Sequence, residues 1–327
     1  MPPSLSVLDL EKPIAELDDQ ISEIKRLTSE QGEDRSEEIA LLESDRDRLI
    51  NEIFANLTPW DKTLLARHPK RPYTLDYVRT IFDDYIELHG DRLFSDDHAI
   101  VGGIATLDDR QVMFIGHQKG RDLKDRRYRN FGSAKPEGYR KALRLAKAAA
   151  KFGKPVICFV DTPAADVSVG AEERGISEAI ARNMMEMSVL EVPIVVVVIG
   201  EGGSGGAIGI AVGDRVLMLE HSIYSVIPPE GCAAIIWRDP AKGKEAADAL
   251  KLTAQGALEL KVIDGIIPEP LGGAHRNIEA AARNLKAEIV KCLDELEKLP
   301  VSKLLEKRYK KFRNMGAFAE EPTEEIS

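Results

Sequence analysis

Apolar residues at helical spacing mark the first part of the chain. Ile14, Leu17, Ile21 and Ile24 recur every three or four positions, and a second stripe of the same kind follows a polar break. This spacing predicts two amphipathic helices that form a hairpin over residues 9–57. The other positions of the hairpin are highly charged, so it has little core of its own. We therefore expect it to pack on a partner subunit or on the main domain.

Unbroken apolar runs later in the chain predict buried strands. Residues 156–160 and 194–199 are rich in β-branched side chains, as is typical of strands covered on both faces of a parallel sheet. Each run is followed by a loop and a helix, a unit that leads to a parallel neighbouring strand. The two loops, residues 161–170 and 200–206, should therefore meet at one edge of the sheet, where ligands bind in such folds. Strand patterns over residues 100–117 add a β-hairpin.

Helical patterns fill most of the remaining chain. They predict helices over residues 74–89, 171–190 and 244–261, and a last helix of the main domain that ends near residue 299. The sequence is thus of the α/β class. We divide it into three parts: the helical hairpin (1–58), the main domain with the C-terminal helices (59–313), and a polar tail that we expect to be mobile (314–327).

Charge and composition exclude several classes of protein. The 327 residues carry a net charge of −10, which argues against a general nucleic-acid or membrane-surface binder. The three cysteines are widely spaced, which excludes a cysteine-rich zinc site and indicates a reducing compartment. No apolar run approaches the length of a membrane span, and the first residues do not resemble a signal peptide. We expect a soluble, cytoplasmic protein.

One segment runs against this acidic background. Residues 119–154 contain 13 Lys or Arg and only three acidic residues. In residues 119–135 we expect the positive charge to meet an anionic ligand or partner, such as a phosphorylated cofactor or an acidic subunit face. No recognised nucleic-acid-binding motif accompanies the segment. The basic side chains of residues 140–154 recur at helical spacing, which favours a solvated helix face (Lys141, Arg144, Lys147 and Lys151).

The most glycine-rich stretch follows the apolar run of residues 194–199. Five glycines surround Ser204 in the sequence GEGGSGG. Glycines have no Cβ atom, so backbone N–H groups can approach a ligand closely. Small residues that suit a short helix follow, and the first N–H groups of a helix have no partner within it. The stretch is therefore suited to hold a negative oxygen with backbone groups rather than with side chains.

Three functional interpretations compete for this stretch, beside the structural one that a glycine-rich turn only lets a helix pack closely. It matches a dinucleotide fingerprint, with Glu220 at the distance of a ribose ligand, but leaves little room for a crossover helix before Gly213. It also matches a nucleophile elbow at Ser204, with acid and histidine candidates downstream (Asp214, Glu220, His221, Asp264 and His275). In the third, the N–H groups of Gly205 and Gly206 form an oxyanion hole without a side-chain nucleophile.

Longer motifs resemble one protein family. They are EGGSGGAIGIAVGD (201–214), YSVIPPEGCAAIIW (224–237) and IIPEPLGGAHRN (266–277), joined by PYTLDYVR (72–79) and GHQKGR (116–121). These motifs are similar to those of the α subunit of bacterial acetyl-CoA carboxylase carboxyltransferase, and the resemblance runs in register through most of the chain. Because the motifs are long, this match is far more specific than the short glycine patterns.

The resemblance implies a crotonase-like fold of repeated ββα units and an α2β2 assembly with a separate β subunit. It implies transfer of a carboxyl group from carboxybiotin, held by a biotin carboxyl carrier protein, to the coenzyme A thioester acetyl-CoA. The product, malonyl-CoA, serves fatty-acid synthesis, and a biotin carboxylase belongs to the wider complex. No metal is implied on this chain, because the family's zinc ribbon belongs to the β subunit.

The resemblance also assigns residues. In the family, paired glycine N–H groups of the α chain act as an oxyanion hole, and Gly205 and Gly206 match that pair. We expect the substrates to be bound beside it, by Gly202, Gly203, Ala164, Ala165, Lys119 and Arg121. Two alternatives stay open: a serine hydrolase with Ser204 as nucleophile, and a carboxyltransferase paralogue that acts on a different acyl-CoA.

One loop departs from the family pattern. Where a DTPGAYPG-like loop is expected, this chain has DTPAADVS at residues 161–168. Two glycines are replaced by Ala164 and Ser168. An aromatic residue is replaced by Asp166, which we expect to add negative charge near an anionic substrate. These changes are compatible with a lineage variant of the same chemistry, a shifted acyl-CoA preference or an impaired paralogue.

Overall fold

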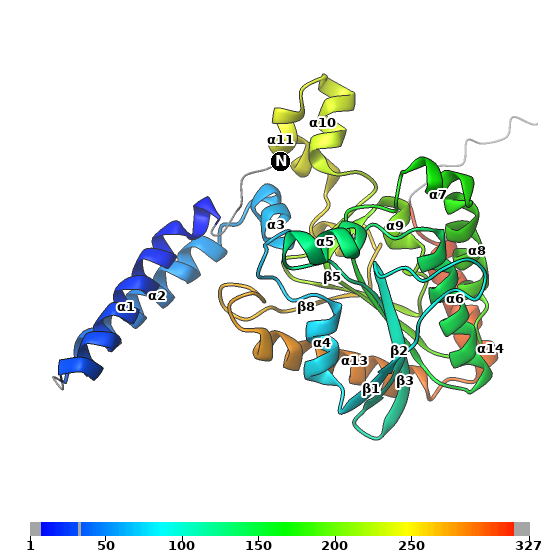
Figure 1. Ribbon diagram of the computed structural model, residues 1–327, viewed down its shortest axis with the longest axis horizontal. Coiled ribbons are helices and arrows are strands. Elements are labelled where there is room, and N and C mark those ends of the chain that lie inside the picture. The colour runs from blue at the N-terminus through cyan, green and yellow to red at the C-terminus, as the bar shows by residue number, and fades with distance from the viewer. Residues whose placement is uncertain (1–7, 32–33, 317–327) are drawn as a thin grey trace, which may run out of the picture.

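A computed structural model describes residues 8–31 and 34–316. Most of the predicted tail (314–327) therefore lies outside the described residues. The centre of the described structure is an eight-stranded sheet (Figure 1). Its strands are β1 (Asp84–Glu87), β2 (Ile100–Leu107), β3 (Arg110–His117), β4 (Val156–Thr162), β5 (Ile194–Gly203), β6 (Arg215–Leu219), β7 (Ile223–Ser225) and β8 (Gly265–Ile267). They lie in the order β1-β2-β3-β4-β5-β6-β8, and β7 pairs with the end of β5. The first three strands are antiparallel, and the pairs from β3 to β8 are parallel.

Helices cover both faces of this sheet (Figure 1). The helices of the described residues, which include the projecting α1 and α2, are η1 (Asp9–Glu11), α1 (Lys12–Gln31), α2 (Ser36–Phe54), α3 (Pro59–Ala66), α4 (Thr74–Ile81), α5 (Leu123–Tyr128), η2 (Asn130–Gly132), α6 (Pro136–Lys151), α7 (Val169–Glu173), α8 (Ile176–Ser188), α9 (Ser204–Ile208), α10 (Pro229–Trp237), η3 (Pro240–Lys242), α11 (Gly243–Leu250), α12 (Ala254–Glu259), α13 (Ile278–Leu296) and α14 (Val301–Arg313). No helix in the described ranges is long and apolar enough to cross a membrane.

The two central strands confirm the prediction from the apolar runs. Successive residues of a strand point to opposite faces of the sheet. Val196 and Val198 of β5 accordingly belong to a core with α6 and α8, whereas Val195 and Val197 belong to a second core with α4 and α13. Because both faces are covered, the strand has no polar side to alternate with, and its sequence is an unbroken apolar run.

The N-terminal helices form the expected hairpin, which projects to one side of the sheet (Figure 1). The ammonium of Lys25 in α1 lies 2.7 Å from the carboxylate of Glu43 in α2. Nearer the sheet, Arg276 Nη2 lies 2.6 Å from Asp18 Oδ2. This ion pair ties the hairpin to the loop before α13, so the hairpin is anchored at its base while most of its length extends away from the sheet.

The helix predicted over residues 74–89 is wrong in its second half. α4 ends at Ile81, and β1 follows as an edge strand paired antiparallel with β2. Tyr85 of β1 packs edge-on against Phe114 of β3, with 6.0 Å between the ring centroids. Pairing with the sheet and partial burial of this ring outweigh the helical spacing of the apolar residues, a tertiary effect that the local pattern does not contain.

Two other predicted helices are interrupted, and one strand is longer than predicted. Residues 171–190 divide into α7 and α8 at Gly175, whose φ of +79° is a left-handed conformation that glycine adopts without strain. Residues 244–261 divide likewise at Lys251, with φ +49°. β5 extends through Gly203 because its end pairs with both β4 and β7. Part of the predicted glycine loop is therefore strand.

Candidate functional site

The two loops that the sequence predicts at one edge of the sheet do meet. β4 and β5 are parallel neighbours, and the loop after β4 lies against β5 and the start of α9. A Cβ atom on Gly206 would lie 2.5 Å from the amide nitrogen of Ala165, and one on Gly203 would lie 2.0 Å from the carbonyl oxygen of Pro163. Real Cβ atoms do not approach backbone this closely, so only glycine allows the contact. We call this meeting of residues 163–165 with residues 203–206 the glycine cradle.

Gly205 and Gly206 offer free backbone donors at the cradle. Both lie in the first turn of α9, where N–H groups have no partner within the helix. Neither N–H group donates a hydrogen bond to any residue in the described part of the chain. α9 has only five residues, so its dipole is small and the N–H groups themselves are what it presents. Unpaired donors of this kind form a candidate site for a negative oxygen.

Two buried side chains hold α9 in place. The hydroxyl of Tyr139 in α6 donates to the carbonyl oxygen of Gly206 at 3.1 Å. The side-chain amide of Asn183 in α8 donates to the carbonyl oxygens of Tyr139 at 2.9 Å and Gly209 at 3.0 Å. Sequence reasoning missed both residues, because one polar position in an amphipathic helix carries no signal of what it meets. Together they fix the cradle to the helices behind it.

Ser204 lacks the surroundings of a catalytic serine. Its φ of +50° is strained, as at a nucleophile elbow, but its hydroxyl makes no hydrogen bond to a histidine or an acid among the described residues. Three candidates for a triad are engaged elsewhere: Asp214 with Arg308 at 2.6 Å, Asp264 with Lys311 at 2.8 Å, and His275 with Glu11 at 2.7 Å. The five residues of α9 also do not provide the crossover helix of a dinucleotide-binding unit.

A network of charged side chains lies beside the cradle. Lys119, just after β3, places Nζ 2.7 Å from both Asp161 Oδ1 in β4 and Glu201 Oε2 in β5. Glu201 Oε1 accepts a hydrogen bond from Arg67 Nε at 2.7 Å, and Arg67 Nη1 lies 2.6 Å from Glu230 Oε1. The network thus joins the ends of three neighbouring strands to the end of α3 and to α10. Only Lys119 belonged to the expected site; the other four residues were missed.

Two buried members of this network, Lys119 and Glu201, are held in their charged forms, whereas burial raises the pKa of the third, Asp161. Burial alone would lower the pKa of Lys119, but the carboxylates of Asp161 and Glu201 raise it above its usual value. Burial also opposes ionisation of Glu201, yet Lys119 and Arg67 lower the pKa of Glu201 to about 2. The ammonium of Lys119, expected to contact substrate, therefore already meets two carboxylates. Its ammonium thus links the ends of β3, β4 and β5, and a contact with substrate stays a prediction.

Arg121, the other expected substrate-binding cation, also has partners within the chain. Its Nη1 donates to the carbonyl oxygens of Pro69 and Arg71, at 2.8 Å each, and its Nη2 contacts the carboxylate of Asp76. The guanidinium lies 4.0 Å from the ring centroid of Tyr73. Arg121 thus ties the basic segment to the turn that leads into α4.

A cavity of about 190 Å³ opens between the network and the basic segment. It is lined by Arg67, Tyr73, Lys119, Gly120, Arg126, Phe131, Pro163 and Glu201. Among the cations that line it, Arg126 has no carboxylate partner in the described part of the chain, and its Nε donates to the carbonyl oxygen of Gly120 at 3.2 Å. Since Pro163 borders both the cavity and the cradle, residues 119–135 reach the edge of the candidate site.

The unusual loop after β4 is stabilised from within. The carboxylate of Asp166 accepts the N–H of Ser168 at 2.8 Å, and the N–H of Asp166 donates to the carbonyl oxygen of Ala134 at 2.9 Å. The hydroxyl of Ser168 in turn caps α7 by accepting the N–H of Ala171. The charge of Asp166 is therefore directed to a turn of its own loop. Ala164 and Ala165 lie at the cradle against Gly206, and their binding of substrate stays a prediction.

One residue predicted to lie on a solvated helix face is buried. Lys141 is 1% exposed, and its Nζ lies 2.6 Å from Asp96 Oδ1 and 2.8 Å from the carbonyl oxygen of Asp97. Lys147 of the same set is exposed, with Nζ 2.8 Å from Glu186 Oε1. The prediction is wrong for Lys141 because its partners, in the loop before β2, are far away in sequence. This lysine anchors α6 rather than facing solvent.

Solved structures with a similar fold are carboxyltransferases and related enzymes. Transcarboxylase 12S superposes with a TM-score of 0.52 at 22% identity, over 67% of this chain and 42% of that one. The β subunit of geranyl-CoA carboxylase from P. aeruginosa gives 0.54 at 15%, over 77% and 46%. A chain of a Pseudomonas malonate decarboxylase gives 0.53 at 16%, over 64% and 84%. This chain spans less than half of the first two. These likenesses confirm the crotonase-like fold.

Sequence relatives match almost end to end. A family model described as acetyl co-enzyme A carboxylase carboxyltransferase-like matches residues 7–316. The acetyl-coenzyme A carboxylase carboxyl transferase subunit α of Geobacter metallireducens is 58% identical, over 96% of this chain and 98% of the relative. The same subunit of Fusobacterium nucleatum is 54% identical, over 95% and 99%. The chain therefore belongs to the family of acetyl-CoA carboxylase carboxyl transferase α subunits.

Proposed function

We propose that this chain is the α half of a carboxyltransferase that moves a carboxyl group from carboxybiotin, on a carrier protein, to acetyl-CoA. The observation that carries the proposal is the pair of unpaired N–H groups at Gly205 and Gly206 in the glycine cradle. Full-length relatives that bear the name of this activity support it. A site made of backbone donors fits a reaction in which the protein stabilises developing charge rather than forming a bond itself.

The cradle fits the group that such a reaction brings to it. Bound carboxybiotin would supply the carboxyl group and a ureido oxygen on which negative charge develops. The N–H groups of Gly205 and Gly206 would donate to that oxygen, and one donor of this type lowers a barrier by about 3–4 kcal/mol. Gly203 and Gly206 admit the backbone of residues 163–165 alongside, so the donors are held by packed main chain and need no reorganisation.

No side chain of this chain has to act as a base. Lys119 is held between two carboxylates. His117, two residues before it, is buried, and its ring nitrogens have no hydrogen-bond partner in the described part of the chain. Burial, and after it the charge of Lys119, lowers the pKa of His117 to about 3. Neither group is ready to take a proton from the acetyl methyl group. We propose that no side chain of this chain accepts this proton.

A β subunit is the partner implied by the α-subunit family, and we propose that it completes the site in an α2β2 assembly. Ile235, Ile236 and Trp237 at the end of α10 are 74%, 61% and 39% exposed, an apolar surface of the kind that partner chains cover. The projecting hairpin offers a second surface, which is mostly charged and includes the exposed Leu41. The β subunit would stabilise the acetyl-CoA enolate, and the carrier protein and a biotin carboxylase would join in the wider complex.

The basic segment 119–135 is proposed to meet the anionic parts of the substrate or of the carrier. Lys119 and Arg121 shape this region through their internal partners, so their contribution is to hold it in place. Arg126 is the better candidate for a direct contact, because it lines the cavity beside Pro163 without a carboxylate partner in the described part of the chain.

Carboxyl transfer between malonyl-CoA and free biotin or biocytin tests the proposal. It should be measured with this chain alone and with the β subunit from the same source. We expect activity only with the partner. A well-formed complex that is inactive with malonyl-CoA but active with another carboxylated acyl-CoA would support the paralogue alternative and point to the loop of residues 164–168. A chain that forms no complex and reacts with a serine-directed phosphonate would contradict the proposal.

A further inference from the structure

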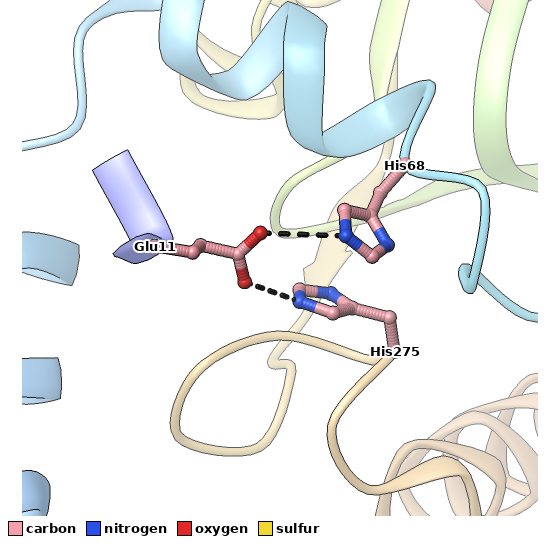
Figure 2. Close-up of side chains that lie close together, drawn as sticks. All are labelled: Glu11, His68 and His275. Atoms are coloured by element: carbon pink, nitrogen blue, oxygen red, sulfur yellow. Dashed lines mark hydrogen bonds and ion pairs between the residues drawn. The ribbon is translucent and has the colours of Figure 1, made fainter. Parts of the chain in front are cut away.

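Three side chains from distant parts of the sequence meet where the hairpin joins the sheet domain (Figure 2). Glu11 lies in η1 at the start of the hairpin, His68 follows α3, and His275 precedes α13. Glu11 Oε1 lies 2.7 Å from His275 Nε2, and Glu11 Oε2 lies 3.4 Å from His68 Nε2. The two imidazole centroids are 4.1 Å apart. All three side chains are at most 4% exposed.

The hydrogen bonds of this cluster are incomplete. Oε2 of Glu11 and Nδ1 of His275 are buried, and neither has a hydrogen-bond partner among the residues that the structure describes. The 3.4 Å approach of His68 to Glu11 therefore brings two polar atoms together without a hydrogen bond between them. Buried carboxylate oxygens are almost always paired, since leaving one unpaired costs about 1–3 kcal/mol or more. An atom that attracts all three groups at once would account for the arrangement.

We propose that Glu11, His68 and His275 bind a divalent transition metal of the zinc class and that this ion fastens the hairpin to the sheet domain. Their potential ligand atoms lie within 4.8 Å of one another. Two ligands bonded at about 2.0–2.2 Å to a tetrahedral zinc ion lie about 3.4 Å apart, so small shifts bring this set to coordination distance. Two imidazoles and one carboxylate favour zinc over calcium or magnesium, which prefer oxygen ligands.

The ring nitrogens that face Glu11 must then offer lone pairs rather than protons. A histidine bound through Nε2 carries its proton on Nδ1. Nδ1 of His275 has no partner within residues 8–31 and 34–316, so it can take that proton. Nδ1 of His68 accepts the N–H of Lys70 at 3.1 Å, so this hydrogen bond has to open when the metal binds. The amide of Lys70 is therefore a local reporter of metal binding.

The site ties the hairpin to the sheet domain at two points, one just after α3 and one just before α13. Glu11 belongs to the hairpin, whereas His68 and His275 belong to the loops on the sheet side (Figure 2). The ion pair between Arg276 and Asp18 lies on the same junction. A bound ion would thus fix the direction in which the hairpin projects. This role is independent of carboxyl transfer and differs from the expectation of a metal-free chain.

Metal titration of the full-length chain, purified alone and treated with a chelator, tests the proposal. Zn²⁺ uptake is followed by calorimetry and by elemental analysis, and Co²⁺ uptake by the visible absorption of a tetrahedral complex. We expect one ion per chain. The Glu11→Gln and His275→Gln variants should bind about tenfold or more weakly, by analogy with the loss of metal affinity when a metal site is altered. Zn²⁺ should raise the thermal unfolding midpoint of the parent chain but not that of the two cluster variants.

His89→Gln is the matched control, because His89 forms an exposed pair with Asp96 at 3.2 Å and would reveal adventitious binding at the surface. It should bind metal as the parent chain does. Exchange of the Lys70 amide should change with metal in the parent and not in His275→Gln. If Glu11→Gln fails to fold, the metal uptake of His275→Gln alone tests the proposal. Absence of stoichiometric uptake, or equal uptake by the parent and the cluster variants, would overturn the proposal.

Discussion

A Cβ atom on Gly205 would meet the Cδ1 atom of Ile180 at 3.6 Å, an ordinary van der Waals contact. Gly205 can therefore accept a side chain, whereas at Gly206 the backbone of Ala165 prevents it. At Gly205 the role of the backbone N–H group can therefore be tested separately from the steric requirement for glycine. With the β partner present, Gly205→Ala keeps the donor and should retain most carboxyl transfer. Gly205→Pro removes the donor and should lower the rate by about 10²–10³-fold.

Proline is tolerated in the first turn of a helix, but Ser204 before it has φ +50°, which a following proline disfavours, so the fold of Gly205→Pro has to be checked first. Circular dichroism, thermal unfolding and complex formation with the partner provide the check. Equal activity of folded Ala and Pro variants would show that the N–H of Gly205 takes no part in the reaction.

Ser204 should be dispensable for activity. Its hydroxyl has no histidine or acid partner in the described part of the chain, so Ser204→Ala should keep carboxyl transfer within about twofold, as for a side chain outside the reaction. Ser204→Gly should also raise stability by about 1 kcal/mol, because φ is +50° and the left-handed region is costly for residues with a Cβ. Transfer assays and denaturant unfolding measure the two effects. Covalent labelling of Ser204 by a phosphonate, with loss of activity, would favour the hydrolase.

Glu201 should make the fold sensitive to acid. Its pKa is about 2 in the folded chain against an ordinary 4.5, so its ionised form stabilises the fold fully above pH 4.5. This stability is lost as the pH falls from 4.5 toward 2. Glu201→Gln should reduce stability at pH 7 by about 3–5 kcal/mol, because it leaves Lys119 with one carboxylate fewer in a buried site. The variant should also depend less on pH in that window.

Denaturant unfolding at pH 7 and pH 4 measures both effects of Glu201→Gln. Glu297→Gln is the control, since Glu297 is an exposed carboxylate paired with Arg110 at 3.2 Å. Exposed pairs contribute about 1 kcal/mol or less, so the control should change little. A Glu201→Gln variant as stable as the control would mean that the network does not hold the strand ends together.

What the sequence could predict depends on how local the cause is. Val195 to Val198 identify a strand because burial on both faces leaves an apolar run, and parallel connection then brings the loop at Ala164 to the glycines. Tyr85 was assigned to a helix because its burial depends on Phe114 across the sheet. Lys141 was assigned to the surface because its acidic partners lie far back in the chain.

The same reason explains what was missed at the site. Lys119 stood out in a basic run, but its ammonium is paired with carboxylates on two other strands. Arg67 and Glu230 gave no signal, since each is one charged residue in a chain with many. Glu11, His68 and His275 are spread over most of the sequence with no ligand spacing to reveal them, and only the folded chain brings them together.

The Asp166 carboxylate should act on its own loop rather than on the substrate. Asp166→Ala removes the acceptor for the N–H of Ser168 and should cost about 1 kcal/mol of stability. Asp166→Asn keeps an acceptor oxygen without the charge, and we expect it to change stability by less than about 0.5 kcal/mol. Unfolding curves and the KM for malonyl-CoA measure the outcome. A KM that falls several-fold in Asp166→Asn would show instead that the charge faces the anionic substrate.

Tyr139 should position the cradle from behind. Its buried hydroxyl donates to the carbonyl oxygen of Gly206, so Tyr139→Phe leaves that oxygen without this donor and should cost about 1 kcal/mol of stability. If the hydroxyl also aligns the N–H groups of α9, kcat should fall while KM for the coenzyme A substrate stays the same, because only the position of the donors changes. Tyr128→Phe is the matched control: it removes the hydroxyl of an exposed tyrosine, which contacts the half-buried His98 at 3.0 Å. Loss of stability with unchanged kcat would limit Tyr139 to packing.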